Sequence, residues 1–169
     1  MTIYHQTIPQ MIRMLTSLDK MFTKAEQFAT AKKFEVNNLL QMRLAPDMYP
    51  LVKQVQVASD TAKAAAARLT GQEPPRYEDN ERTIDEVHER LKKTINYLKT
   101  FKVDDFKGCE DRKVNLPWAP GKYMHGSDYV TEMALPNFYF HTTTAYAILR
   151  HNGVDIGKMD FLGDANIKG

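Results

Sequence analysis

The stretch that decides the fold is Pro136–Gly163, PNFYFHTTTAYAILRHNGVDIGKMDFLG. It predicts one helix that ends at Asn152-Gly153 and is followed by a tail punctuated by glycines. Asn137 and His141 stand four residues apart, so they share one face of this helix, one turn apart. Both side chains can bind a metal, and the face around them is otherwise aromatic and aliphatic. Because burying a polar group without a partner is costly, we expect a site on this face.

Two long apolar stripes earlier in the chain predict two more helices. The stripe from Tyr4 to Ala29 recurs at alternating steps of four and three residues, as in a long amphipathic helix. Pro9 lies inside it and either occupies the first turn of a helix starting near Thr7 or kinks a longer one. The stripe from Leu51 to Leu69 is rich in alanine, whose small side chain lets a neighbouring helix come close.

A third helix and an irregular excursion complete the pattern. Thr83 and Glu86 have the spacing of a capping box ahead of the stripe from Ile84 to Leu98. The helical period then breaks, and we expect a short irregular hairpin near residues 110–125. Beyond it the fourth helix either restarts at Pro136 or carries a kink there. We therefore predict an all-α fold, an antiparallel four-helix bundle forming a single domain over residues 1–169, with a short irregular β-hairpin between helices three and four.

Composition argues against several classes of protein. With 169 residues, 43% of them hydrophobic and 26% charged, the chain has the make-up of an ordinary globular domain. A net charge of +2, with basic residues interleaved among acids, gives no sign of nucleic-acid binding. No apolar run approaches the roughly 20 residues that span a bilayer, and no signal peptide is evident. We expect a cytoplasmic protein that engages neither nucleic acid nor membrane.

The single cysteine, Cys109, excludes an internal disulfide framework. It precedes Glu110-Asp111, whose carboxylates would raise the pKa of its thiol. We therefore do not expect a reactive nucleophile at this position.

The fourth helix, with its inward histidine about twelve residues before a stopping glycine, resembles the DinB/YfiT superfamily of four-helix metalloenzymes. The match continues through RLAPDMYPLVKQVQVASDTAK, residues Arg43–Lys63. These stretches are similar to a branch of that superfamily that carries a domain-of-unknown-function label. The resemblance spans nearly the whole chain and implies the DinB-like bundle.

The resemblance also implies a divalent metal held by three histidines, one on helix two and two on helix four at H-x-x-x-H spacing. The two positions on helix four fall on Asn137 and His141, and the position on helix two falls on Gln54, with Gln56 and Asp60 as alternatives in register. Only one histidine is matched. Amide oxygens suit calcium or magnesium better than zinc or nickel. We expect an altered or vestigial pocket that binds nickel, zinc, manganese or magnesium weakly or not at all, or that holds a ligand through hydrogen bonds.

Four further side chains are expected around this pocket: Trp118, Tyr123, His125 and Phe138. Trp118 lies between two prolines, so it either anchors the hairpin on the bundle or forms a pocket lid or subunit contact. Core packing is the simpler explanation for the aromatic residues, since they bury large areas.

Three hypotheses for function follow. The first is a DinB-like protein with an altered divalent-metal pocket centred on His141 and no assigned catalytic role. The second is a non-catalytic bundle that acts as a homodimer or through a partner protein. The third is a metal-dependent thiol transferase or hydrolase, like some members of the superfamily, with His141 as the remaining ligand or the general base.

Overall fold

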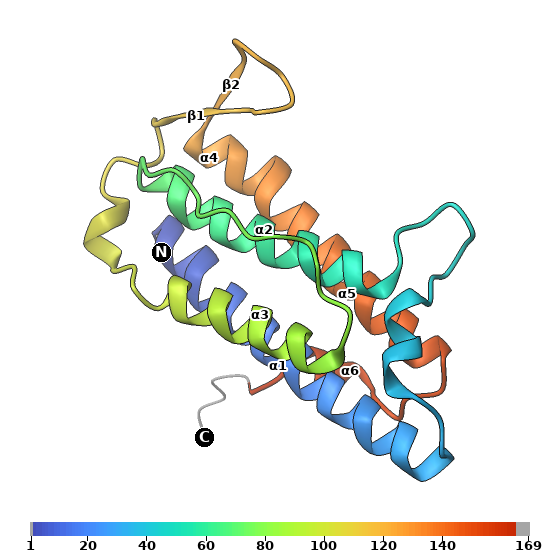
Figure 1. Cartoon of the computed structure of the whole chain (residues 1–169). Coiled ribbons are helices and arrows are strands. Elements are labelled where there is room, and N and C mark those ends of the chain that lie inside the picture. The colour runs from blue at the N-terminus through green and yellow to red at the C-terminus, as the bar shows by residue number, and fades with distance from the viewer. Residues whose placement is uncertain (1, 165–169) are drawn as a thin grey trace.

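Four long helices pack around a common apolar core in the computed structural model, which describes residues 2–164. They are α1 (Ile3–Lys32), α2 (Leu51–Leu69), α3 (Ile84–Leu98) and α5 (Leu135–His151) (Figure 1). The largest fully buried side chains come from all four helices and include Met11, Leu15, Phe22, Leu51, Leu69, Leu91 and Phe138. The bundle is confirmed, while the domain predicted over residues 1–169 extends at both ends beyond the described residues.

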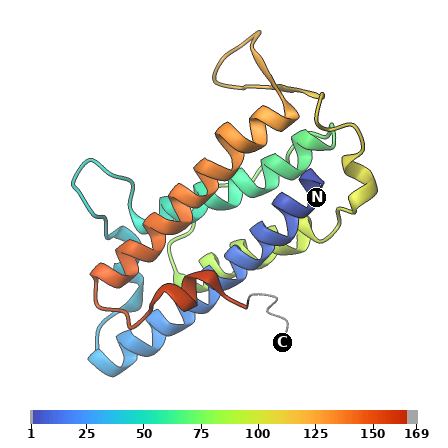
Figure 2. The same cartoon turned by 180° about the vertical axis from the view of Figure 1, so that it is seen from behind.

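The helices do not simply alternate in direction. The chain runs one way along α1 and α5 and the opposite way along α2 and α3 (Figures 1 and 2). Between α2 and α3, residues 70–83 return along the length of the bundle, and we call this segment the strap. Its far end lies beside the first half of α2, where Gln56 Nε2 donates to Glu81 Oε2 at 2.8 Å. Consequently α2 and α5 are antiparallel neighbours, whereas α2 and α3 are parallel.

Helix α1 begins at Ile3, so Pro9 lies in its interior and the longer of the two expected helices forms. After the short helix η1 (Val36–Gln41), Pro50 precedes α2 at its N-cap position. Helix α3 opens with the predicted capping box. The Glu86 amide donates to Thr83 Oγ1 at 3.2 Å, and the Thr83 amide donates to Glu86 Oε2 at 3.0 Å.

The excursion after α3 is the expected short hairpin. It follows the helical turn η2 (Val103–Phe106) and pairs β1 (Lys113–Asn115) with β2 (Tyr123–His125) in antiparallel register. Val114 is buried and fixes the hairpin to the bundle. The next residue after β2 is Gly126, where a Cβ would lie 1.8 Å from the carbonyl oxygen of Cys109. Only glycine allows this close approach of the two backbones.

The fourth long helix is continuous from the hairpin to His151. It consists of α4 (Gly126–Asp128), the π-helical segment η3 (Tyr129–Ala134) and α5. Leu135 keeps helical angles (φ −68°, ψ −48°), so the helix passes through Pro136 without restarting, and Asn137 lies inside it. A wider turn directly before proline is a common adjustment, because proline has no N–H for the regular helical bond. The helix ends as predicted, with Gly153 at φ +95°.

The tail returns across α1 as the short helix α6 (Lys158–Leu162) (Figure 2). Lys24 on α1 pairs with Asp160 at 2.7 Å, and the rings of Tyr146 and Phe161 meet edge to face. Within the described part of the chain, no helix combines the length and hydrophobicity required to cross a membrane.

Candidate functional site

His141 and Gln54 face each other between α5 and α2. Nδ1 of His141 lies 2.7 Å from Oε1 of Gln54, and the two residues are 6% and 1% exposed. Gln54 Nε2 donates to the carbonyl of Tyr49 at 3.0 Å, which orients the amide so that its oxygen faces the imidazole. From this network we assign the hydrogen of the neutral ring to Nδ1, which leaves the lone pair on Nε2.

Burial lowers the pKa of His141 below its ordinary value. Charging a buried imidazole is unfavourable, and among residues 2–164 its one side-chain hydrogen-bond partner is the neutral amide of Gln54. The ring is therefore a neutral base at physiological pH.

The structure also distinguishes between the expected residues on α2. Gln56 donates to Glu81 at 2.8 Å, and Asp60 accepts from Arg90 at 2.9 Å, so both face the strap and α3. Gln54 is the residue that meets His141. In metal sites, the histidine nitrogen that does not bind the metal usually donates to a second protein group. Gln54 occupies the position of that second group, so it orients the imidazole of His141 and is not itself placed as a metal ligand.

Asn137 has a different neighbour although it shares a face with His141. Its Nδ2 donates to Thr61 Oγ1 at 2.7 Å, and the half-buried side chain lines a separate pocket. The donor set therefore consists of one imidazole and two amides that are already bonded to other protein groups. Within residues 2–164, no group of three or more His, Cys, Asp or Glu side chains is placed to hold a metal ion. This set does not fit the three strong ligands of a nickel or zinc centre.

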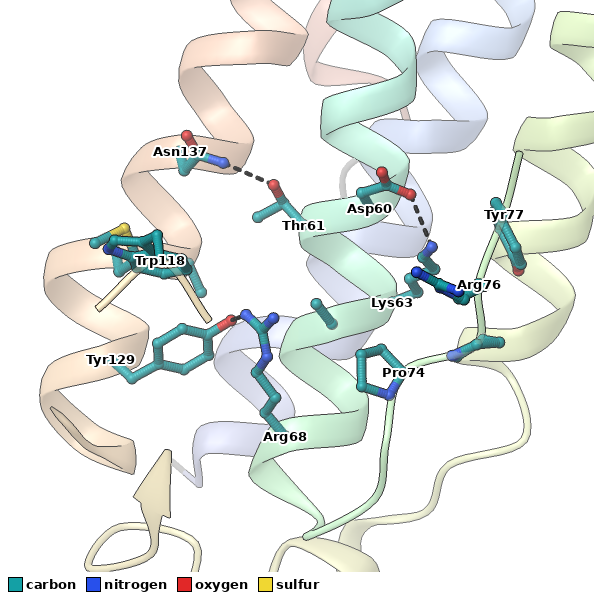
Figure 3. A pocket seen from close by; sticks show the side chains of 14 residues that line it. Asp60, Thr61, Lys63, Arg68, Pro74, Arg76, Tyr77, Trp118, Tyr129 and Asn137 are labelled. Atoms are coloured by element: carbon teal, nitrogen blue, oxygen red, sulfur yellow. Dashed lines mark hydrogen bonds and ion pairs between the residues drawn. The ribbon is translucent and has the colours of Figure 1, made fainter. Parts of the chain in front are cut away.

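The pocket beside Asn137 has a volume of about 610 Å³ and lies between α2, η3, the strap and the turn of the hairpin (Figure 3). Trp118 lines it and is 57% exposed, so this side chain does not serve as a buried anchor. The other three expected pocket residues lie elsewhere. Phe138 is fully buried in the core, and Tyr123 and His125 project from β2, where His125 Nδ1 contacts the carbonyl of Asp111 at 3.1 Å.

The pocket is rich in positive charge. Lys63, Arg68 and Arg76 line it, against the single carboxylate of Asp60. Asp60 is already paired with Lys63 at 2.8 Å. Arg68 donates from Nη1 to the hydroxyl of Tyr129 at 3.3 Å, and burial raises the pKa of this phenol, so it stays neutral.

A buried arginine, which was not among the residues predicted from the sequence, fixes the strap that walls the pocket. The side chain of Arg90, on α3, is 2% exposed and pairs with Glu81 at 2.8 Å, Asp60 at 2.9 Å and Asp79 at 3.1 Å. Tyr77 of the strap lies between the ammonium groups of Lys63 and Lys93, each 4.1 Å from its ring centre. Arg90 could have been recognised from the sequence because it lies three residues after Val87, on the buried side of α3.

Comparison with known proteins agrees with this architecture. Residues 3–162 match the family model described as Domain of unknown function (DUF1993). Among solved structures, the chain is similar to the crystal structure of a DinB family member protein from Shewanella denitrificans. The two share 44% sequence identity with a TM-score of 0.95, over 99% of this chain and 95% of that one. A comparison with curated proteins found no match. The predicted resemblance to a DinB-like branch is confirmed.

Proposed function

Because the chain belongs to the DUF1993 family and shares the DinB-like fold, we propose that it carries an altered form of the divalent-metal pocket of that fold, centred on His141. In this proposal the protein binds a small molecule through hydrogen bonds in the neighbouring pocket, which Asn137 lines. The observation that carries it is the 2.7 Å bond between His141 Nδ1 and Gln54 Oε1. Two of the three expected ligand positions are bonded to each other, and the third opens on the pocket.

A buried, neutral imidazole still has chemical use. With Nδ1–H held by Gln54, the lone pair of His141 Nε2 can accept a hydrogen bond or a proton. A metal at this position would lower the pKa of a bound thiol or water, as the third hypothesis requires. A single imidazole with two occupied amides supports that chemistry less than it supports simple binding.

Elemental analysis of protein purified without a histidine tag tests the altered pocket, with His141→Ala as the matched variant. We expect far less than one metal per chain in both proteins, also after incubation with nickel, zinc, manganese or magnesium. Near-stoichiometric metal that is lost in His141→Ala would overturn the proposal in favour of metal-dependent chemistry.

A thermal-shift screen tests the binding function directly. Small polar molecules that stabilise the wild type should stabilise Asn137→Leu less, because this variant removes an amide from the pocket wall. Asn96→Leu is the control, since Asn96 lies on α3, away from this pocket. Equal shifts in the wild type and Asn137→Leu would place binding elsewhere.

The second candidate function is association through an exposed surface, as a homodimer in the cytoplasm. Three aromatic side chains that remain more than half exposed are available for such a contact: Tyr49 at 56%, Trp118 at 57% and Phe140 at 57%. Light scattering over a dilution series tests this candidate. A dimer that survives dilution supports it, and a monomer at every concentration excludes it.

A further inference from the structure

The positive charge of the pocket is only partly neutralised by the protein itself. Of its three cations, Lys63 pairs with Asp60, the one carboxylate in the lining. Within residues 2–164, Arg68 and Arg76 form no ion pair, and the one side-chain bond of Arg68 goes to a neutral phenol. Two guanidinium groups that share a pocket without a counter-charge are suited to bind an anion, since each offers several N–H donors in a planar fork.

The opposite side of the pocket is apolar and exposed. Trp118 of the hairpin turn lines it on the side of Tyr129 and Asn137 (Figure 3), and Met133 of η3 belongs to the same lining. Pro74 and Pro75 stiffen the part of the strap that lines the pocket. An indole ring left 57% exposed gains most when a flat group covers it. The volume of about 610 Å³ lies within the usual range for sites of small organic molecules.

We infer that the pocket binds a small organic anion carrying a flat apolar group, with Arg68 and Arg76 holding the anionic end and Trp118 covering the ring. This inference rests on the proposed function, because it assumes that the pocket is a ligand site. It adds the charge and shape of the ligand and the residues that select them. Carboxylates and phosphate monoesters share the required chemistry.

Trp118 also supplies the readout, because it is the single tryptophan of the chain. Its indole N–H gives one peak in a ¹⁵N-correlated NMR spectrum, which can be followed during titration. The probes are phenylacetate, phenyl phosphate, the neutral phenylacetamide and the cationic phenethylammonium. We expect both anions to shift the peak, with phenylacetate binding about tenfold more tightly than phenylacetamide and losing affinity as salt is added. Phenethylammonium should not bind.

Arg76→Gln is the main variant, because Arg76 is exposed and we expect its replacement to leave the fold intact. It should weaken phenylacetate binding by about tenfold and leave phenylacetamide binding unchanged. Arg68→Gln should do the same, whereas Arg68→Lys keeps the charge but loses the planar fork and should give an intermediate loss. Arg82→Gln is the matched control, since it removes the same charge from the same strap outside the pocket lining.

The possible outcomes distinguish an error in the ligand class from an error in the binding site. If phenylacetamide binds as tightly as phenylacetate and Arg76→Gln changes neither, the ligand class is wrong while the pocket remains a binding site. If Arg82→Gln weakens phenylacetate as much as Arg76→Gln, general attraction explains the binding and the inference fails. No shift of the Trp118 peak with either anion, up to the solubility limit, refutes the inference, and the binding function then fails only if the thermal-shift screen also finds no ligand that depends on Asn137.

Discussion

Replacing Gln54 by leucine would remove the acceptor of the His141 Nδ1–H and leave a polar group buried without a partner. An unsatisfied buried donor costs about 1–3 kcal/mol, and the bond from Gln54 Nε2 to Tyr49 is lost as well, at about 0.5–1.5 kcal/mol. We expect Gln54→Leu to reduce the free energy of unfolding by about 2–4 kcal/mol. Urea denaturation followed by circular dichroism measures it, provided that the slope with denaturant is unchanged.

A second variant shows whether the loss comes from the pair itself. In the double variant Gln54→Leu/His141→Leu both polar partners are replaced by apolar groups, so no donor is left unsatisfied. The double variant should be more stable than the sum of the single losses predicts, by about 1–2 kcal/mol. Gln6→Leu, at an exposed site on α1, should stay within about 0.5 kcal/mol of the wild type. Additive losses, or a loss below about 0.5 kcal/mol for Gln54→Leu, would refute the assigned hydrogen bond.

Three further predictions follow from charge and packing. Arg90→Met should lower the free energy of unfolding in urea by about 3–5 kcal/mol, because it removes the buried guanidinium and leaves its carboxylates without a positive partner. A loss below about 1 kcal/mol contradicts this role. Partial burial opposes protonation of His88, but bonds to two carboxylates of α1 outweigh it and raise its pKa. The stabilisation from protonated His88 should therefore be complete below the unfolded pKa of about 6.5 and disappear as pH rises through the higher folded pKa. The stability lost in His88→Gln should fall over that pH range, and a loss that stays constant would contradict the prediction. Gly126→Ala should lower the free energy of unfolding by about 3 kcal/mol, measured by heat or urea, because its Cβ would meet the backbone of Cys109. Gly157→Ala, with open space around it, should be nearly neutral. Equal effects of the two substitutions would refute the clash.

Local patterns predicted the elements of this fold well. The capping box at Thr83, the stop at Gly153 and the break that became the hairpin each depend on a few neighbouring residues. The direction of α3 depends on contacts between residues that are farther apart in the sequence. The strap from residue 70 to 83 has the sequence of a polar loop, and its contacts with Gln56 and Arg90 show that it runs back along the bundle.

The candidate site was predictable only in part. The spacing of Asn137 and His141 placed them on one face, and the resemblance placed Gln54 on the facing helix. In the structure, Asn137 donates to Thr61 of α2 and His141 contacts Gln54. Spacing could not show that His141 and Gln54 bond to each other, since that depends on the side-chain orientation set by Tyr49. Whether any of these residues binds a metal stays a prediction.

The π-helical segment Tyr129–Ala134 sets the register between two helices. On α2, the contact residues Thr61 and Arg68 are seven apart, which brings them back to nearly the same angle around a regular helix. Their partners, Asn137 and Tyr129, are eight apart, and a regular helix would rotate one of them by about 80° away from the other. The wider turn absorbs the extra residue, so both partners face α2. If one residue of this segment were deleted and Pro136 replaced, we expect an ordinary helix that keeps both contacts with α2. The π-helical turn thus accommodates one inserted residue in the wall of the pocket without changing the contacts on either side of it.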